Sequence, residues 1–310
     1  AILLKGSDGV SDYGNKIGEP LIGGFCRSFG QMVNNERREF RKPVLYSAGF
    51  GRINDIHVKK SEPEVGMCIV RIGGPAYRIG VGGGSASSMI HGTSDADLDF
   101  KSVQRGNAEM ENRVNRVIQT CAEMDVKNPI ESIHDQGAGG PSNVLTELME
   151  PAGGRVDIRK IIVGDVTMSV LEIWVAEYQE GYGLLVRPEN LSVFQAICVR
   201  ERVNCEVMGE ITGDGNVVVV DSNDNSTPVN LSLADILGDL PQKRFASNRR
   251  AVSLPPLTLP QGLTVEEALH KVFRLPSVGS KGFLVRKVDR SVTVLVAQQQ
   301  CCGPMQVPVT

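Results

Sequence analysis

A glycine-rich run from Gly80 to Ser88 has the composition of an anion-binding loop. It begins Gly-Val-Gly-Gly-Gly-Ser and follows a segment with the pattern of a strand. Backbone N–H groups of successive glycines can converge on a phosphate, because no side chain stands in the way. The run matches neither the P-loop nor the dinucleotide-binding pattern. A phosphate site and a tight structural turn therefore both remain open interpretations.

Three aspartates, Asp95, Asp97 and Asp99, alternate along the sequence. In an extended strand their carboxylates would face one side, which is costly unless water or a cation compensates the charge. A metal site is one interpretation. A solvated loop is the favoured one, because the remaining spacing and the closing Glu of an EF-hand are absent.

The triplet His134, Asp135 and Gln136 stands at the end of an expected strand, directly before Gly137-Ala-Gly-Gly and an expected helix. Ligand-binding groups of α/β folds gather at such strand ends. A carboxylate there can hold Mg2+ and, through it, phosphate oxygens, so Asp135 is the candidate metal ligand. His134 is interpreted as a packed, hydrogen-bonded imidazole, and no second His lies close enough in sequence to complete a zinc pair.

The segment from Glu172 to Glu180 alternates in a way that predicts a strand. On such a strand Glu177 and Gln179 project to one face, where they can grip an amide or a ribose by hydrogen bonds. Tyr178 projects to the other face together with Glu180. A solvated edge strand is the alternative interpretation of this segment.

Strand, loop and helix signals alternate from residue 64 to residue 222, and this order predicts one complete α/β domain. The expected strands cover residues 67–72, 129–134, 168–176 and 183–186, and the expected helices cover residues 108–124, 143–149 and 191–201. Residues 206–211 and 217–220 are expected to pair as a two-stranded ribbon that turns at Gly213-Asp-Gly.

The flanking segments predict incomplete domains on either side of a linker. Residues 1–63 contain an expected strand at 43–48, and residues 223–262 form a polar, proline-containing connection with one short helix at 233–237. Residues 263–310 begin another domain, with a helix capped by Thr264 and strands at 282–288 and 291–297. Both ends of the chain are expected to continue into a longer protein.

The charge balance excludes several classes of partner. The chain has 33 Lys and Arg residues and 36 Asp and Glu residues, so its net charge is -3. We therefore expect no dominating basic surface for nucleic acid or membrane lipid. The apolar runs are shorter than the roughly 18 residues of a membrane span, and no targeting segment is evident, so we expect a cytoplasmic location. Seven cysteines without C-x-x-C spacing indicate neither a disulfide framework nor a thiolate zinc site.

Taken together, the motifs closely resemble the central synthetase region of the phosphoribosylformylglycinamidine synthase family, in its large single-chain form. They occur in the family's order along essentially the whole chain, in the segments 11–20, 73–88, 94–100, 102–111, 134–140, 171–180, 289–292 and 303–309. The resemblance implies an α/β (α+β) fold like that of aminoimidazole-ribonucleotide synthetase. Its parts would be a truncated N-type domain (1–63), a complete C-type domain (64–222), a linker (223–262) and the start of a second N-type domain (263–310).

The resemblance implies an ATP-dependent amidation in purine synthesis. Formylglycinamide ribonucleotide, glutamine and ATP would give formylglycinamidine ribonucleotide, glutamate, ADP and phosphate, with Mg2+ as the metal. Phosphorylation of the amide oxygen would let ammonia displace it as phosphate. The ammonia would come from a glutaminase domain of the same full-length chain.

The resemblance also implies roles for single residues. Asp135 matches a magnesium ligand and Gln104 a substrate-binding glutamine. Glu177, Tyr178 and Gln179 match a substrate-binding triplet usually written Glu-Ser-Gln, and we expect the departing Tyr178 to face away from the ligand. Phosphate or nucleotide contacts are expected from Gly82, Gly83, Gly84, Ser85, Gly23, Gly24 and Phe25, the last three in a turn after residue 20.

By the same resemblance, several parts of the family's machinery are expected outside this sequence. The catalytic histidine of the family would precede residue 1, a second metal-binding Asp would follow residue 310, and the glutaminase cysteine has no match. The chain alone is therefore expected to be inactive. Two alternatives remain: another ATP-using member of the same superfamily, or a catalytically inactive scaffold.

Overall fold

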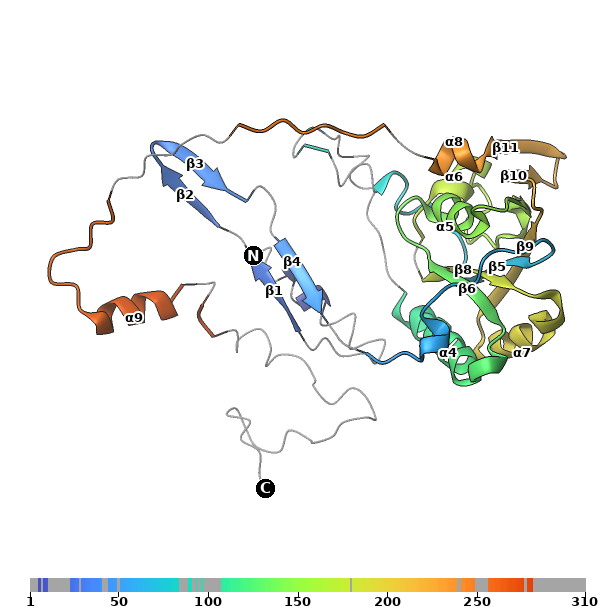
Figure 1. Cartoon of the computed structure of the whole chain (residues 1–310), viewed down its shortest axis with the longest axis horizontal. Helices are drawn as coiled ribbons and strands as arrows, with labels where there is room; N and C mark the ends of the chain where they lie inside the picture. The colour runs from blue at the N-terminus through green and yellow to red at the C-terminus, as the bar shows by residue number, and fades with distance from the viewer. Residues whose placement is uncertain are drawn as a thin grey trace, which may run out of the picture. The chain divides into compact units, whose positions relative to one another are not determined.

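Figure 1 shows a computed structural model of the whole chain. The described residues are 5, 6, 8–10, 23–27, 29–40, 44–48, 51–83, 89, 90, 93, 96, 107–178, 180–238, 241–248, 256–275 and 278–280. The chain divides into two units, which we name the central unit (residues 50–239) and the flanking unit (residues 1–49 with 240–310). The division of the chain into four parts at residues 63, 222 and 262 stays a prediction.

The central unit is built on a seven-stranded sheet with the strand order β11-β10-β7-β9-β5-β8-β6. Its strands are β5 (Cys68–Gly73), β6 (Ile130–Asp135), β7 (Gly154–Asp157), β8 (Gly181–Val186), β9 (Asn204–Ile211), β10 (Asn216–Asp221) and β11 (Ser226–Ser232). The ladders are antiparallel except for β7 and β10, which run parallel. The sheet is therefore mixed, in line with the α/β (α+β) class expected from the sequence.

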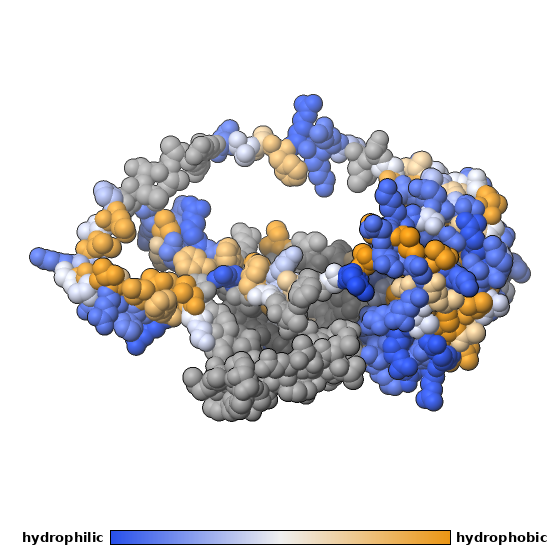
Figure 2. All heavy atoms as spheres, turned by 60° about the horizontal axis from the view of Figure 1, so that its bottom comes forward, coloured by the Kyte–Doolittle hydropathy of each residue, from blue (hydrophilic) through white to orange (hydrophobic). Residues whose placement is uncertain are grey.

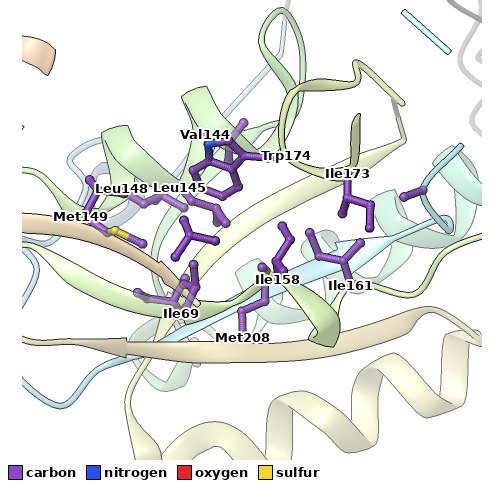
Figure 3. Packing of buried hydrophobic residues seen from close by; sticks show 14 of the residues in the cluster. Ile69, Val144, Leu145, Leu148, Met149, Ile158, Ile161, Ile173, Trp174 and Met208 are labelled. Atoms are coloured by element: carbon purple, nitrogen blue, oxygen red, sulfur yellow. The ribbon is translucent and has the colours of Figure 1, made fainter. Parts of the chain in front are cut away.

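Helices cover both faces of this sheet, and each face has its own core. The helices are α4 (Ala108–Glu123), α5 (Gly140–Met149), α6 (Val170–Val175), α7 (Leu191–Glu201) and α8 (Leu233–Leu237). Ile69 and Leu185 point towards α5 and α6, as Figure 3 shows for Ile69, whereas Val70 and Leu184 pack with α4 and α7. Successive strand residues thus face opposite cores, as the period of two requires.

Most predicted elements of the central unit are confirmed. Strands occur at the expected places around residues 67–72, 129–134 and 183–186, and helices at 108–124, 143–149, 191–201 and 233–237. The helix α4 begins where the Asn107 side chain accepts a hydrogen bond from the backbone N–H of Met110. Local periodicity was a sufficient signal for these elements.

The strand predicted over residues 168–176 is wrong, because Val170–Val175 form the helix α6. Ser169 caps this helix at the backbone N–H of Glu172, and the Glu172 carboxylate accepts a hydrogen bond from the backbone N–H of Ser169. This reciprocal capping box stabilises the first turn. Ile173 and Trp174 then bury their side chains in the core that Figure 3 shows.

The ribbon predicted from residues 206–211 and 217–220 is also wrong. The strand β7 lies between β9 and β10, pairing Gly154 with Ile211 on one side and with Val217 on the other. A β-carbon at Gly209 of β9 would lie 1.8 Å from the carbonyl oxygen of Arg155, so a glycine is required there for the strands to approach. Residues 226–232, expected within the linker, form the edge strand β11 on β10.

Among the described residues of the flanking unit, the longer elements are two small antiparallel sheets and the helix α9. The strands are β1 (Gly23–Arg27) paired with β4 (Val44–Ala48), and β2 (Gly30–Val33) paired with β3 (Glu36–Glu39). The predicted strand at 43–48 and the predicted helix are confirmed, since α9 (Val265–Phe273) begins at a capping box between Thr264 and Glu267. Figure 2 shows apolar and hydrophilic atoms on opposite sides of α9. The strands predicted at 282–288 and 291–297 lie outside the described residues.

Candidate functional site

The end of β6 is joined to the start of β8 at the edge of the central sheet. Asp135 pairs with Tyr182 in the strand register, and the next residue, Gln136, donates its backbone N–H to the carbonyl oxygen of Gly181 at 2.8 Å. The Asp135 side chain is 78% exposed. The predicted metal ligand therefore lies at a strand end and is open to solvent.

Two glycines let the turn after β6 pack closely against the segment that follows α6. Gly139 and Gly140 have φ angles of +82° and +57°. A β-carbon at Gly140 would lie 2.2 Å from the carbonyl oxygen of Ala176. The N-terminus of α5 thus rests directly on the segment that carries Glu177, a contact that a larger residue at position 140 would prevent.

Glu177 lies in the loop between α6 and β8, not on a strand as predicted. Only 3% of the residue is exposed, and its Oε1 accepts a hydrogen bond from the backbone N–H of Gly139 at 3.1 Å. An N–H group at the start of a helix is a favourable partner for a carboxylate, because the helix dipole places positive charge there.

The glycine-rich segment lies against the same carboxylate residue. The backbone N–H of Glu177 donates to the carbonyl oxygen of Ile79 at 3.1 Å, and a β-carbon at Gly80 would lie 2.7 Å from the Glu177 Cβ. Gly80 and Gly82 have φ angles of +66° and +71°, and Gly83 donates its N–H back to Gly80. The structure therefore brings together the glycine run, Glu177 and the glycine turn after Asp135.

Several predicted site residues lie outside the described part of the chain. These are Gly84, Ser85, Gln104 and Gln179, together with the three aspartates Asp95, Asp97 and Asp99. Their predicted roles stay predictions.

Tyr178 is a core residue in this fold. It is 2% exposed, its hydroxyl donates to the carbonyl oxygen of Ile173 at 3.0 Å, and the Arg71 guanidinium lies 4.9 Å from its ring centre. Burial raises the pKa of the phenol above its ordinary value. Because Ile173 accepts from its hydroxyl and Arg71 covers its ring, the substrate role that the family triplet implies for Tyr178 stays a prediction without geometric support.

A second carboxylate stands near Asp135. Glu111 of α4 accepts a hydrogen bond from the Tyr182 hydroxyl at 3.1 Å, and its pKa is raised mainly by burial and further by the negative charge of Asp135. Within the described residues no group of three or more His, Cys, Asp or Glu side chains is placed to hold a metal ion. Mg2+ commonly uses one or two carboxylates and takes its other ligands from phosphates and water, so the donors at Asp135 fit this ion.

His134 makes the contacts of a packed imidazole, as expected. Its Nδ1 lies 2.7 Å from the carbonyl oxygen of Asp135, and its Nε2 lies 2.5 Å from Oε2 of Glu147 on α5. Both ring nitrogens are therefore engaged within the protein.

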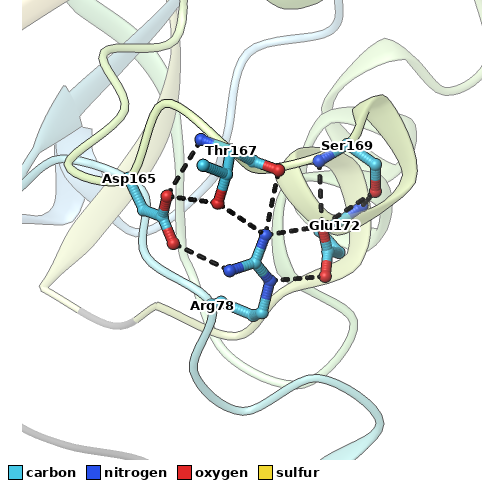
Figure 4. Close-up of polar contacts among 5 residues, drawn as sticks. All are labelled: Arg78, Asp165, Thr167, Ser169 and Glu172. Atoms are coloured by element: carbon cyan, nitrogen blue, oxygen red, sulfur yellow. Dashed lines mark hydrogen bonds and ion pairs between the residues drawn. The ribbon is translucent and has the colours of Figure 1, made fainter.

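Arg78 anchors the glycine-rich segment to the start of α6, and the sequence analysis did not single it out. Its guanidinium donates to Asp165 at 2.8 Å, to Glu172 at 2.6 and 3.2 Å, and to Thr167 (Figure 4). The hydrogen bond from Arg78 is the largest cause that lowers the pKa of Glu172 to about 2, and the backbone N–H of Ser169 adds to it. These contacts of Arg78 with Asp165, Thr167 and Glu172, which we call the Arg78 clamp, fix the chain two residues before Gly80.

Gly23, Gly24 and Phe25 lie in the strand β1, not in a turn as predicted. A β-carbon at Gly24 would lie 2.3 Å from the carbonyl oxygen of Tyr46 on β4, which explains the glycine. Phe25 stacks on the Tyr46 ring with a 5.5 Å centroid distance. The nucleotide contact expected of these residues stays a prediction.

Two family models match the chain. Residues 64–222 match the model described as AIR synthase related protein, C-terminal domain, and residues 280–310 match the FGAR-AT PurM_N-like domain. None of the helices in the described part of the chain is long and apolar enough to cross a membrane.

Curated relatives match the chain from end to end. The probable phosphoribosylformylglycinamidine synthase, chloroplastic/mitochondrial, of Arabidopsis thaliana is 53% identical over 318 residues, covering 99% of this chain and 23% of the relative. The phosphoribosylformylglycinamidine synthase of Homo sapiens is 48% identical over 325 residues, covering 99% of this chain and 24% of the relative. The chain spans about a quarter of the length of these relatives.

Solved structures share the fold. T. maritima PurL complexed with FGAR superposes with a TM-score of 0.63 at 23% identity, covering 82% of this chain and 40% of that one. T. maritima PurL complexed with ATP gives a TM-score of 0.61 at 20% identity, covering 87% and 42%. These likenesses confirm the fold class expected from the sequence.

Proposed function

The chain belongs to the family of AIR synthase related proteins through residues 64–222, and on this premise we propose that it supplies part of the synthetase region of a phosphoribosylformylglycinamidine synthase. The curated relatives that support this proposal carry that name and are 44–53% identical along the chain. The alternative of another ATP-using enzyme of the same superfamily has less support. The relatives that match the whole chain all carry the one name.

The proposed reaction converts formylglycinamide ribonucleotide, glutamine and ATP into formylglycinamidine ribonucleotide, glutamate, ADP and phosphate. An amide oxygen is a poor leaving group, so its phosphorylation by ATP allows ammonia to displace it as phosphate. The ammonia would come from a glutaminase domain of the same full-length chain. Mg2+ would supply positive charge that offsets the charge of the phosphates.

Each described site residue has a part in this proposal. Asp135 would hold Mg2+ from the exposed end of β6, and Gly82 would present its backbone N–H group to a phosphate, while Gly83, whose own N–H donates to Gly80, would shape the same phosphate-binding turn. Glu177 would contact the ribonucleotide from its place beside Gly139. We propose the same ligand classes for the other predicted residues, which are Gln104, Gln179, Gly84, Ser85, Gly23, Gly24 and Phe25.

The observation that carries the proposal is the convergence of three separate segments on Glu177. The N-terminus of α5 binds its carboxylate, Ile79 accepts its backbone N–H, and Gly80 leaves room for its side chain. A glutamate held in this glycine-lined corner offers an acceptor to hydroxyl or amide groups of a ligand, and the exposed Asp135 offers an oxygen ligand to the Mg2+ that would accompany phosphate groups.

Two experiments on the full-length protein test the proposal. Calorimetric titration measures the binding of formylglycinamide ribonucleotide and, separately, of ATP with Mg2+. An enzyme assay measures the formation of the amidine product. We expect binding of both ligands and formation of the amidine. An inactive scaffold would bind neither ligand, and another ATP-using enzyme would bind ATP alone.

The cytoplasmic location is likewise a proposal, which cell fractionation tests, since the Arabidopsis relative is named chloroplastic/mitochondrial.

A further inference from the structure

A fully buried arginine lies within the apolar strand β5. Arg71 is 1% exposed, and its guanidinium donates from three nitrogens to three different segments. Nε donates to Oε1 of Gln136 at 3.0 Å, and Nη1 donates to Oε2 of Glu206 at 2.6 Å. Nη2 donates to the carbonyl oxygen of Gly74 at 2.8 Å. Such a charge is stable in a core only because its donors are paired.

These partners connect Arg71 to each part of the proposed site. Gln136 follows Asp135 directly, and its side-chain amide donates in turn to the carbonyl oxygen of Tyr178. The ring of Tyr178, the residue after Glu177, lies beneath the guanidinium. Gly74 opens the segment that leads to the glycine run. The Arg71 guanidinium therefore contacts the residue after the proposed metal ligand and the residue after the proposed substrate glutamate. It also binds the start of the segment that leads to the glycine run.

We propose that Arg71 is a positioning residue for the reaction, which holds these three segments in one fixed arrangement without touching a ligand itself. The inference rests on the proposed function. Reacting groups must be held within a fraction of an ångström for catalysis, and a displacement of about 1 Å can cost on the order of 100-fold in rate. The guanidinium supplies this precision because it is rigid and forked.

The residues around the Arg71 guanidinium leave room for its planar group. A β-carbon at Gly181 would lie 3.2 Å from Nη2 of Arg71 and 3.3 Å from Oε1 of Gln136, so a side chain there would crowd both groups. A lysine at position 71 would keep a positive charge for Glu206. It could not reach Gln136, Glu206 and Gly74 at once, because its donors sit on a single nitrogen.

Arg71→Lys in the full-length protein separates positioning from charge pairing. We expect the variant to fold with a lowered melting temperature, because buried acceptors lose their donors, and to lose about 10- to 100-fold in kcat when assayed below that temperature. If Arg71 served only to neutralise Glu206, lysine would preserve kcat, and that result would overturn the proposal.

Gln136→Met provides a second test that leaves the ion pair between Arg71 and Glu206 intact, and it decides the question if Arg71→Lys does not fold. It removes the link to Tyr178, so we expect a similar loss of kcat. The double variant should lose no more than the worse single one, because both act through one network. Independent, multiplying losses would overturn the proposal.

Arg159→Lys is the control, since it weakens a second ion pair, more exposed than that of Arg71, where β7 and β10 end. Arg159 donates to both carboxylate oxygens of Asp221, at 2.7 and 2.5 Å. We expect a lower melting temperature and an unchanged kcat. If the wild-type protein forms no amidine, the proposed function fails, whereas an active wild type with a fully active Arg71→Lys variant rejects this inference alone.

Discussion

The carboxylate of Glu177 accepts a hydrogen bond from the backbone N–H of Gly139 at 3.1 Å, across 38 residues of sequence. This bond joins the loop after α6 to the first residue before α5, and so links the predicted substrate triplet to the turn that follows the predicted metal ligand.

Replacement of Glu177 tests its contact with the ribonucleotide. Glu177→Ala removes a buried acceptor, and we expect the KM for formylglycinamide ribonucleotide to rise roughly 5- to 150-fold, as for a loss of 1–3 kcal/mol. Glu177→Gln keeps an oxygen acceptor for Gly139 and should lose less. Steady-state kinetics with each substrate varied measure this, and a rise confined to the KM for ATP would move Glu177 to the nucleotide.

Asp135→Asn tests the metal site. The side chain is exposed, so the fold should persist, but the neutral amide is a weaker ligand for Mg2+. We expect about 10- to 100-fold lower turnover at limiting Mg2+, measured as rate against magnesium concentration. Glu147→Gln, which removes a nearby charge bound to His134, is the control and should keep the wild-type magnesium dependence. Equal curves for Asp135→Asn and the wild type would reject the assignment.

Gly80→Ala tests the packing of the glycine segment on Glu177. Its φ of +66° alone costs an alanine about 1 kcal/mol, and the contact of the new β-carbon with Glu177 should raise the total to about 2–3 kcal/mol. Gly66 has a φ of +90° with open space around it, so Gly66→Ala isolates the backbone cost. Urea unfolding compares the two variants. Equal losses would show that the contact is relieved by a small shift.

The Arg78 clamp predicts a pH-dependent stability. The pKa of Glu172 falls from 4.5 to about 2 in the folded chain, so its contribution is complete above pH 4.5 and is lost as the pH falls towards 2. Arg78→Met should lower stability only slightly at pH 7, because solvent screens the partly exposed groups, and should flatten the acid slope. Urea unfolding between pH 7 and pH 2.5 measures this. An unchanged slope in the variant would contradict the assignment.

The buried cysteines predict low thiol reactivity. Burial raises the pKa of Cys121 to about 12, and the pKa of Cys198 is also raised, first by a hydrogen bond with Cys205 and then by burial. Because the thiolate is the reactive form, both residues should resist iodoacetamide at pH 8 in the native chain and react after denaturation. Peptide mass spectrometry reports the labelled fraction at each site. Rapid native labelling of either residue would show that its helix opens readily.

The sequence by itself determined the elements whose signals come from near neighbours. The period of α4, its Asn107 cap, the capping box of α9 and the apolar run of β5 each involve residues a few positions apart, so they are legible without the fold. The capping box of Ser169 and Glu172 was equally local. The prediction of a strand there followed the alternation of the neighbouring residues and did not take this capping box into account.

One feature of the sequence indicates the network around Arg71: this charged residue lies inside an otherwise apolar strand. Its main partner, Glu206, is 135 residues away, and no local pattern pairs the two. The burial of Glu177 beside Gly139 and the insertion of β7 between β9 and β10 depend in the same way on which segments meet. Only the tertiary structure decides such contacts, because their free energy arises from desolvating and pairing groups that are brought together when the whole sheet and its helices have packed.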